Sequence, residues 1–135
     1  MDSDQRTLVF VYGTLKRGCS NHNQMAGQEF VAEARTPPGY RLFVVADYPG
    51  MVRDPTDTRG VAGELWSVDA KKLAELDRFE GVPEKLYRRD PLPLQAPHDQ
   101  VSAHGYLYLR TVRGRRPLTD GNWPLPLGPT QSTSG

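Results

Sequence analysis

Cysteine is almost absent from this sequence: Cys19 is the only one among 135 residues, so no disulfide can form within the chain. Long apolar runs are missing as well, and none approaches the ~20 residues that a membrane-spanning helix requires. The first six residues, from Met1 to Arg6, are polar and lack the apolar stretch of a secretory signal peptide. We therefore expect a cytoplasmic protein in a reducing compartment, without a membrane partner.

An excess of one charge is also lacking, because 17 basic and 16 acidic residues leave a formal net charge of +1. Proteins that bind nucleic acid usually carry a basic excess or stripe, so no nucleic-acid partner is expected. The densest basic segment, residues 110–116, is interpreted as a solvated loop in preference to a weak anion site. Three histidines show no metal-ligand spacing with cysteine or carboxylates, and no metal site is predicted: His22, His98 and His104.

The length fits one domain, and a chain of this size can bury about two-thirds of its unfolded surface without disulfides or metals. From residue 125 onward the sequence consists mainly of Pro, Gly, Ser and Thr, a composition typical of disorder. We therefore expect a single domain over residues 1–124 and a disordered tail over 125–135. No helical segment shows a second apolar stripe, so a monomer is expected.

Most of the chain shows strand patterns, and only residues 69–79 show convincing helical periodicity. Leu73, Leu76 and Phe79 share one face of this helix, which Asp69 is placed to cap. A short helix is predicted over 20–27, and turns are predicted over 47–50 and 54–57. Strands are predicted over 8–12, 29–34, 40–45, 61–68, 87–94 and 101–109. The fold class is α+β, a mixed sheet or small barrel with one principal helix. Gly63, inside the fourth strand, indicates a bulge or a close backbone contact.

The first segment with chemical potential is the turn that follows the first strand, with the sequence Tyr12, Gly13, Thr14, Leu15. A buried strand that runs into a glycine turn can leave backbone N–H groups unpaired. Such a nest can hold a carboxylate or a developing oxyanion. By itself the pattern is weak support for such a site, because a strand followed by a glycine turn is more often only a turn.

The second candidate is Glu80, which lies four residues after Leu76 and therefore on the apolar face of the predicted helix. Burial there would raise the pKa of the carboxyl and suit it to proton transfer near neutrality. If the helix ended before this position, Glu80 would be a solvated side chain, and periodicity alone does not decide between the two.

Cys19 is a third candidate, as a nucleophile, because it lies three residues from His22. A catalytic pair is defined in space and needs an orienting third group, so this spacing in a loop is weak support.

Together these segments resemble the γ-glutamylcyclotransferase superfamily, and most closely its γ-glutamylamine cyclotransferase branch. The resemblance covers about residues 7–123. It is carried by residues 9–18 with Asn21 and His22, by residues 63–66, by the run 76–82 with Glu80, and by residues 86–89 with Tyr87.

The resemblance implies a small mixed β-barrel flanked by helices. It implies a γ-glutamyl cyclotransferase that forms 5-oxoproline and releases an amine or amino acid, with no cofactor. The partner is then a small γ-glutamyl substrate. Glu80 would be the catalytic acid/base, and the substrate-binding residues would be Tyr12, Gly13, Thr14, Leu15 and Tyr87. The sequence departs from the branch at Cys19 and Ser20 and over 91–99, so the resemblance does not identify the leaving group.

Three other readings remain open at this point. A binding module of the same fold could have lost the chemistry. A γ-glutamyl hydrolase or transferase could use the same pocket with water or another amine as the nucleophile. An interaction domain could use the basic segment 110–116.

Overall fold

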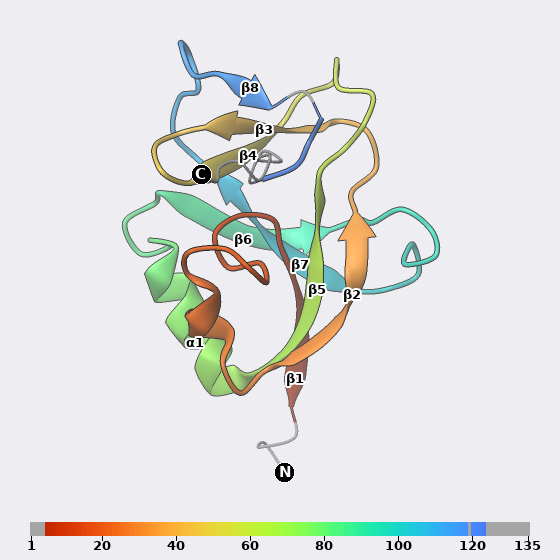
Figure 1. Ribbon diagram of the computed structural model, residues 1–135, viewed down its shortest axis with the longest axis vertical. Helices are drawn as coiled ribbons and strands as arrows, with labels where there is room; N and C mark the ends of the chain where they lie inside the picture. Colours follow the sequence, from red (N-terminus) through yellow and green to blue (C-terminus); the bar gives the residue numbers. More distant parts are fainter. Residues whose placement is uncertain (1–4, 119, 124–135) are drawn as a thin grey trace, which may run out of the picture.

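The computed structural model describes residues 5–118 and 120–123, and the predicted tail from residue 125 lies outside this part of the chain. Figure 1 shows a molecule built mostly of strands. In chain order the elements are β1 (Arg6–Val11), a short 3-10 helix (His22–Met25), β2 (Glu29–Arg35), β3 (Tyr40–Val44), β4 (Pro49–Arg53), β5 (Ala62–Asp69), α1 (Ala70–Phe79), β6 (Tyr87–Leu92), β7 (Ala103–Tyr108) and β8 (Pro117–Leu118).

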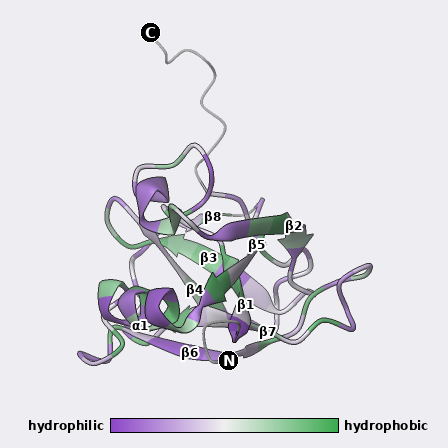
Figure 2. Cartoon of the chain, turned by 90° about the horizontal axis from the view of Figure 1, so that it is seen from below, coloured by the Kyte–Doolittle hydropathy of each residue, from purple (hydrophilic) through white to green (hydrophobic). Residues whose placement is uncertain are grey.

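Helix α1 confirms the helix predicted from periodicity. The Asp69 side chain caps it by accepting a hydrogen bond from the Lys72 N–H at 2.7 Å. Leu76 is fully buried, and Figure 2 shows both purple and green along α1, as expected for a helix with one polar and one apolar face. In the described part of the chain, no helix is long and apolar enough to cross a membrane.

The larger sheet has five strands in the order β2-β5-β1-β7-β6, and β1 lies at its centre. β1 pairs antiparallel with β5 and parallel with β7, whereas the remaining neighbours pair antiparallel. Strand β1 is covered on both faces, and Val9, Phe10 and Val11 are all buried. This position explains why the strand reads as a continuous apolar run instead of an alternating one.

The smaller sheet has three strands in the order β4-β3-β8. The expected closed barrel is therefore wrong: within residues 5–118 and 120–123 the strands form two open sheets, of five and three strands. Closure requires a fixed strand tilt and stagger around the whole sheet, and a sequence pattern carries neither quantity. The α+β class and the mixed sheet are confirmed.

Two hydrophobic clusters lie on opposite faces of the five-stranded sheet. One joins Phe10 and Leu65 to the smaller sheet through Leu42 and Met51. The other joins Val9 and Val11 to the region under α1, through residues that include Trp66, Leu76, Tyr87 and Tyr106. Alternate residues of β1 thus serve different clusters, and this strand ties the two halves of the core together.

Two local predictions differ from the structure. Residues 47–50 were predicted as a turn, but β4 begins at Pro49 and continues to Arg53. The proline starts the strand, where its missing N–H costs no ladder bond. The helix predicted over 20–27 is reduced to the 3-10 helix His22–Met25, and no side-chain hydrogen bond caps its first turn.

Gly63 was predicted to mark either a bulge or a close backbone contact, and the structure shows the close contact. The register shift between β2 and β5 lies on β2 and not at Gly63. A Cβ atom at Gly63 would lie 2.5 Å from the Val11 carbonyl oxygen and 2.6 Å from Cζ of Phe10. We predict that Gly63→Ala destabilises the fold by about 1–3 kcal/mol, because the core strand would have to move. Chemical denaturation measures this loss.

The matched control is Val31→Ala on β2, whose side chain is exposed. This change should alter the stability by less than about 0.5 kcal/mol. Equal stability of Gly63→Ala and the wild type would contradict the prediction.

Candidate active site

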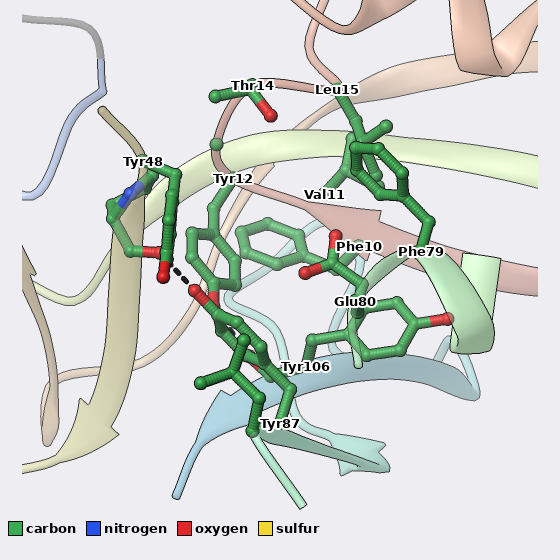
Figure 3. A pocket seen from close by; sticks show the side chains of 13 residues that line it. Phe10, Val11, Tyr12, Thr14, Leu15, Tyr48, Phe79, Glu80, Tyr87 and Tyr106 are labelled. Atoms are coloured by element: carbon green, nitrogen blue, oxygen red, sulfur yellow. Dashed lines mark hydrogen bonds between the residues drawn. The ribbon is translucent and has the colours of Figure 1, made fainter. Parts of the chain in front are cut away.

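A cavity of about 170 Å³ lies where β1, α1, β6 and the start of β4 meet. Cavities of about this volume hold a benzene-sized ligand. All six sequence-predicted site residues line it: Tyr12, Gly13, Thr14, Leu15, Glu80 and Tyr87. Figure 3 labels all of these except Gly13 and shows them around one space. The wall also contains residues that the sequence did not single out as site residues: Tyr48, Pro49, Phe79, Leu86 and Tyr106.

The topology explains why distant segments meet here. Strand β1 ends at Val11 between β5 and β7, so the turn after it opens beside Tyr106 on β7. Helix α1 follows β5 directly and returns along the sheet, which brings Glu80 to the same end of β1. Gly81, with φ of 77°, then turns the chain toward β6 and Tyr87.

Glu80 stays in the helical conformation, with φ of −79° and ψ of −5°. Its N–H donates to the Leu76 carbonyl at 2.8 Å, so the helical hydrogen bonding continues through this residue instead of ending before it. Figure 3 shows the Glu80 carboxyl pointing toward the end of β1. The residue is half-buried, and in the described part of the chain no hydrogen bond reaches its carboxyl.

The surroundings of Glu80 favour the protonated carboxyl. Burial raises the pKa of Glu80 to about 7, and the nearby Asp77 carboxylate adds to the rise. Among the described residues that line the cavity, Glu80 is the only carboxylic acid, and no lysine, arginine or histidine is present. A carboxyl with a pKa near neutrality can both accept and return a proton during a reaction.

Residues 13–15 have the features expected of a backbone nest. The Gly13 carbonyl accepts a hydrogen bond from the Lys16 N–H at 3.1 Å, and the Thr14 carbonyl accepts one from the Asn21 N–H at 2.9 Å. In contrast, none of the backbone hydrogen bonds found among the described residues outside helices and strands has the N–H of residue 13, 14 or 15 as its donor. These donors are available to an anionic or polar ligand atom.

Gly13 brings this turn into tight contact with the start of β4. A Cβ atom there would lie 3.0 Å from both Cδ and Cγ of Pro49, the residue that starts β4. The turn and β4 therefore approach each other closely and enclose one side of the cavity.

The two predicted tyrosines line the cavity with their rings, while their hydroxyls bind the backbone. The Tyr12 hydroxyl donates to the Tyr106 carbonyl at 2.7 Å and accepts from the Met51 N–H at 3.2 Å. The Tyr87 hydroxyl donates to the Pro49 carbonyl at 2.6 Å. Burial raises the pKa of both phenols, which therefore stay neutral. Both side chains fasten β4 to the five-stranded sheet.

Cys19 and His22 do not line this cavity, and the bond found between them joins the His22 N–H to the Cys19 carbonyl. Burial raises the pKa of the Cys19 thiol, which disfavours the thiolate that a nucleophile requires. Among the described residues, no group of three or more His, Cys, Asp or Glu side chains could hold a metal ion.

The basic segment 110–116 is partly engaged with the chain itself. Arg115 donates to the Val45 carbonyl at 2.7 Å, and Arg110 donates to the carbonyls of Glu84 and Lys85. These contacts agree with the loop interpretation of the segment.

The sequence profile of the family described as "Gamma-glutamyl cyclotransferase, AIG2-like" matches residues 9–125. A Vibrio cholerae protein provisionally named a gamma-glutamylcyclotransferase is 38% identical over 116 residues, which cover 86% of this chain and 94% of the relative. The human gamma-glutamylaminecyclotransferase is 39% identical over 101 residues, which cover 70% of this chain and 65% of the human protein. The crystal structure of an AIG2-like protein from Mus musculus superposes with a TM-score of 0.66 at 30% identity and covers 79% of this chain and 78% of the mouse chain.

The tyrosine contacts predict how Tyr12→Phe behaves. The ring and hence the cavity wall remain, but the Met51 N–H and the Tyr106 carbonyl lose a buried partner. We expect a loss of about 1–3 kcal/mol in the free energy of unfolding, measured by chemical denaturation. Tyr48→Phe is the control, because no hydrogen bond of its hydroxyl is found among the described residues; wild-type stability of Tyr12→Phe would refute the structural role.

Proposed function

Because this chain belongs to the γ-glutamyl cyclotransferase, AIG2-like family, we propose that it cyclises γ-glutamyl compounds to 5-oxoproline and releases the amine carried on the γ-carbonyl. The observation that carries the proposal is the pairing of two features in one cavity. Glu80, whose pKa is about 7, lines the same cavity as residues 13–15, whose N–H groups have no hydrogen-bond partner in the part of the chain that the structure describes.

The reaction needs no nucleophile from the protein. The α-amine nitrogen of the substrate attacks its own γ-carbonyl carbon, a new C–N bond closes the ring, and the original γ-amide C–N bond breaks. Glu80 accepts the proton that the attacking amine loses and donates it to the leaving nitrogen, so protons balance over one turnover. A carboxyl with a pKa far below 7 would be a poor acid for the second step.

The N–H groups of residues 13–15 are suited to negative charge on the substrate. They can bind its α-carboxylate, the oxyanion that forms on the γ-carbonyl oxygen, or both. Among the described residues no cationic side chain lines the cavity, so these backbone dipoles and the Thr14 hydroxyl are placed to meet an anion there. The close wall of Gly13, Pro49 and Tyr12 restricts the flexible glutamyl chain, and this restriction lowers the entropic part of the barrier.

The cavity also favours one class of leaving group. Phe79 lines it and is 42% exposed, so its ring lies at the rim, where a leaving group would emerge. An apolar rim without a cation favours an amine that carries no carboxylate near the scissile bond. γ-Glutamyl amines are therefore proposed as better substrates than γ-glutamyl α-amino acids or glutathione, in keeping with the name of the human relative.

The first test is mass-spectrometric detection of 5-oxoproline from a panel of γ-glutamyl amines and γ-glutamyl amino acids. We expect wild-type protein to form 5-oxoproline and Glu80→Gln to lose about 100-fold or more in turnover, because an amide cannot transfer protons. Glu84→Gln, in the exposed segment just after the helix, is the matched control and should keep wild-type turnover.

The products separate the competing functions. Free glutamate would identify a hydrolase, a new γ-glutamyl compound would identify a transferase, and ligand binding without any product would identify a binding module. Wild-type turnover in Glu80→Gln would remove Glu80 from the mechanism.

The pKa of Glu80 predicts a pH dependence. The base form starts the reaction, so kcat/KM should rise as the pH increases through about 7 and then level off. A rate–pH profile measured with a γ-glutamyl amine checks this. A profile that stays flat between pH 5 and about 8 would contradict the assignment.

The same carboxyl has a stability signature that does not require turnover. The pKa of Glu80 lies above its ordinary value of 4.5, so the folded state binds the proton more tightly than the unfolded state. Its contribution to stability is therefore present below about 4.5 and is lost as the pH rises through about 7. Relative to wild type, Glu80→Gln should gain stability between pH 5 and pH 8.

A further inference from the structure

Asp77 lies one helical turn before Glu80 on α1, so the two carboxyls are neighbours along the helix. The Asp77 carboxyl is strongly held. The Tyr106 hydroxyl donates to its Oδ1 at 2.7 Å, Nε of Arg89 donates to the same oxygen at 2.8 Å, and Nη2 of Arg89 donates to Oδ2 at 3.2 Å. Asp77 thus joins α1 to β7 and β6 at the edge of the cavity.

Arg89 makes a further contact on its far side. Its Nη1 lies 2.7 Å from Nδ1 of His104 on β7. A guanidinium has only donors, so Nδ1 of His104 must be the acceptor, which defines the protonation of that ring nitrogen. The Asp77 and Arg89 side chains are each 24% exposed, and this partial burial limits screening of their charges by solvent.

Other groups that face Glu80 carry no charge. Tyr12 comes from the end of β1, Tyr87 from β6 and Tyr106 from β7, and burial raises the pKa of all three phenols. Asp77 is therefore the charge next to Glu80, with the positive charge of Arg89 behind it. Two neighbouring carboxyls do not ionise independently, and their surroundings decide which one keeps a proton.

The hydrogen bonds to the two carboxyls indicate which of them keeps the proton. Three donors reach the Asp77 carboxylate, whereas none of the described residues donates to Glu80. Hydrogen bonds and an adjacent cation favour an ionised carboxylate, so the negative charge resides on Asp77 and the proton on Glu80.

We propose that Asp77 is a positioning residue of this site: Arg89 and Tyr106 hold it ionised next to Glu80, and its negative charge keeps the exchangeable proton on Glu80. This role rests on the proposed function, since it gives Glu80 the proton transfer. It also assigns Arg89, which does not line the cavity, the task of preventing the two carboxyls from sharing one proton.

The test is a direct titration of the Glu80 carboxyl by carbon-detected NMR in the substrate-free protein, with the signal identified by its loss in Glu80→Gln. In Asp77→Asn, which keeps the shape and the amide oxygen, the Glu80 midpoint should fall below the wild-type value, because the like charge is gone while Arg89 remains. The acid limb of the rate–pH profile should move to lower pH in parallel.

Arg89→Gln should give a different signature. Without the guanidinium, Asp77 and Glu80 should titrate together in two steps, as coupled carboxyls do. Arg89→Lys, which restores the charge, should return the Glu80 curve toward a single step. In the double variant Asp77→Asn/Arg89→Gln the Glu80 midpoint should lie between those of Asp77→Asn and the wild type.

Glu75→Gln is the control, because it removes a carboxylate of the same helix whose partner is Lys72 and should leave the Glu80 titration unchanged. An unchanged Glu80 midpoint in folded Asp77→Asn overturns the proposal, and so does an unchanged single step in Arg89→Gln. If Asp77→Asn does not fold, Arg89→Gln and Arg89→Lys still decide the question. Absence of 5-oxoproline from wild-type protein across the substrate panel would defeat the proposed function alone, because the titration uses no substrate.

Discussion

Strand β1 is the constraint on which the rest of the structure depends. It pairs with β5 on one side and β7 on the other, and its side chains alternate between the two hydrophobic clusters. The strand stops at Val11 because the next residues turn away from both neighbours to meet β4. The end of β1 at Val11 positions the parts of the cavity wall. The turn follows it in the chain, α1 follows its neighbour β5, and Tyr106 lies on its other neighbour, β7.

The Glu80 carboxyl is buried without the groups that usually stabilise a buried negative charge. In the described part of the chain the half-buried Glu80 carboxyl receives no hydrogen bond and no cation lines its cavity, so nothing there offsets the cost of ionising it. The cost is what moves the pKa of Glu80 toward 7. One turn earlier on the same helix, Asp77 has a cation and three donors, so the two acids differ because of their surroundings and not because of their chemistry.

The tyrosines illustrate how a residue can belong to a site without offering it a polar group. Tyr12 and Tyr87 line the cavity, yet each hydroxyl is committed to backbone on another strand. Their contribution is the shape of the wall and the fixed position of Pro49. This framework role explains why a short turn can present its N–H groups in a defined place.

The sequence by itself determined the elements and the identity of the candidate groups, because these depend on local patterns. Three features can be identified without a structure: the apolar run of β1, the helix with Leu73 and Leu76 on one face, and the glycine at position 13. The sequence predicts that Glu80 faces inward only if the helix continues to this residue. The hydrogen bond from the Glu80 N–H to the Leu76 carbonyl shows that the helix does continue. The tertiary structure alone decided three features. The strands form two open sheets and not a barrel, residues 49–53 form a strand, and Arg89 and Tyr106 bind Asp77. Each of these depends on pairing between segments far apart in the chain, and side-chain periodicity carries no information about which distant backbone or side-chain group will lie opposite.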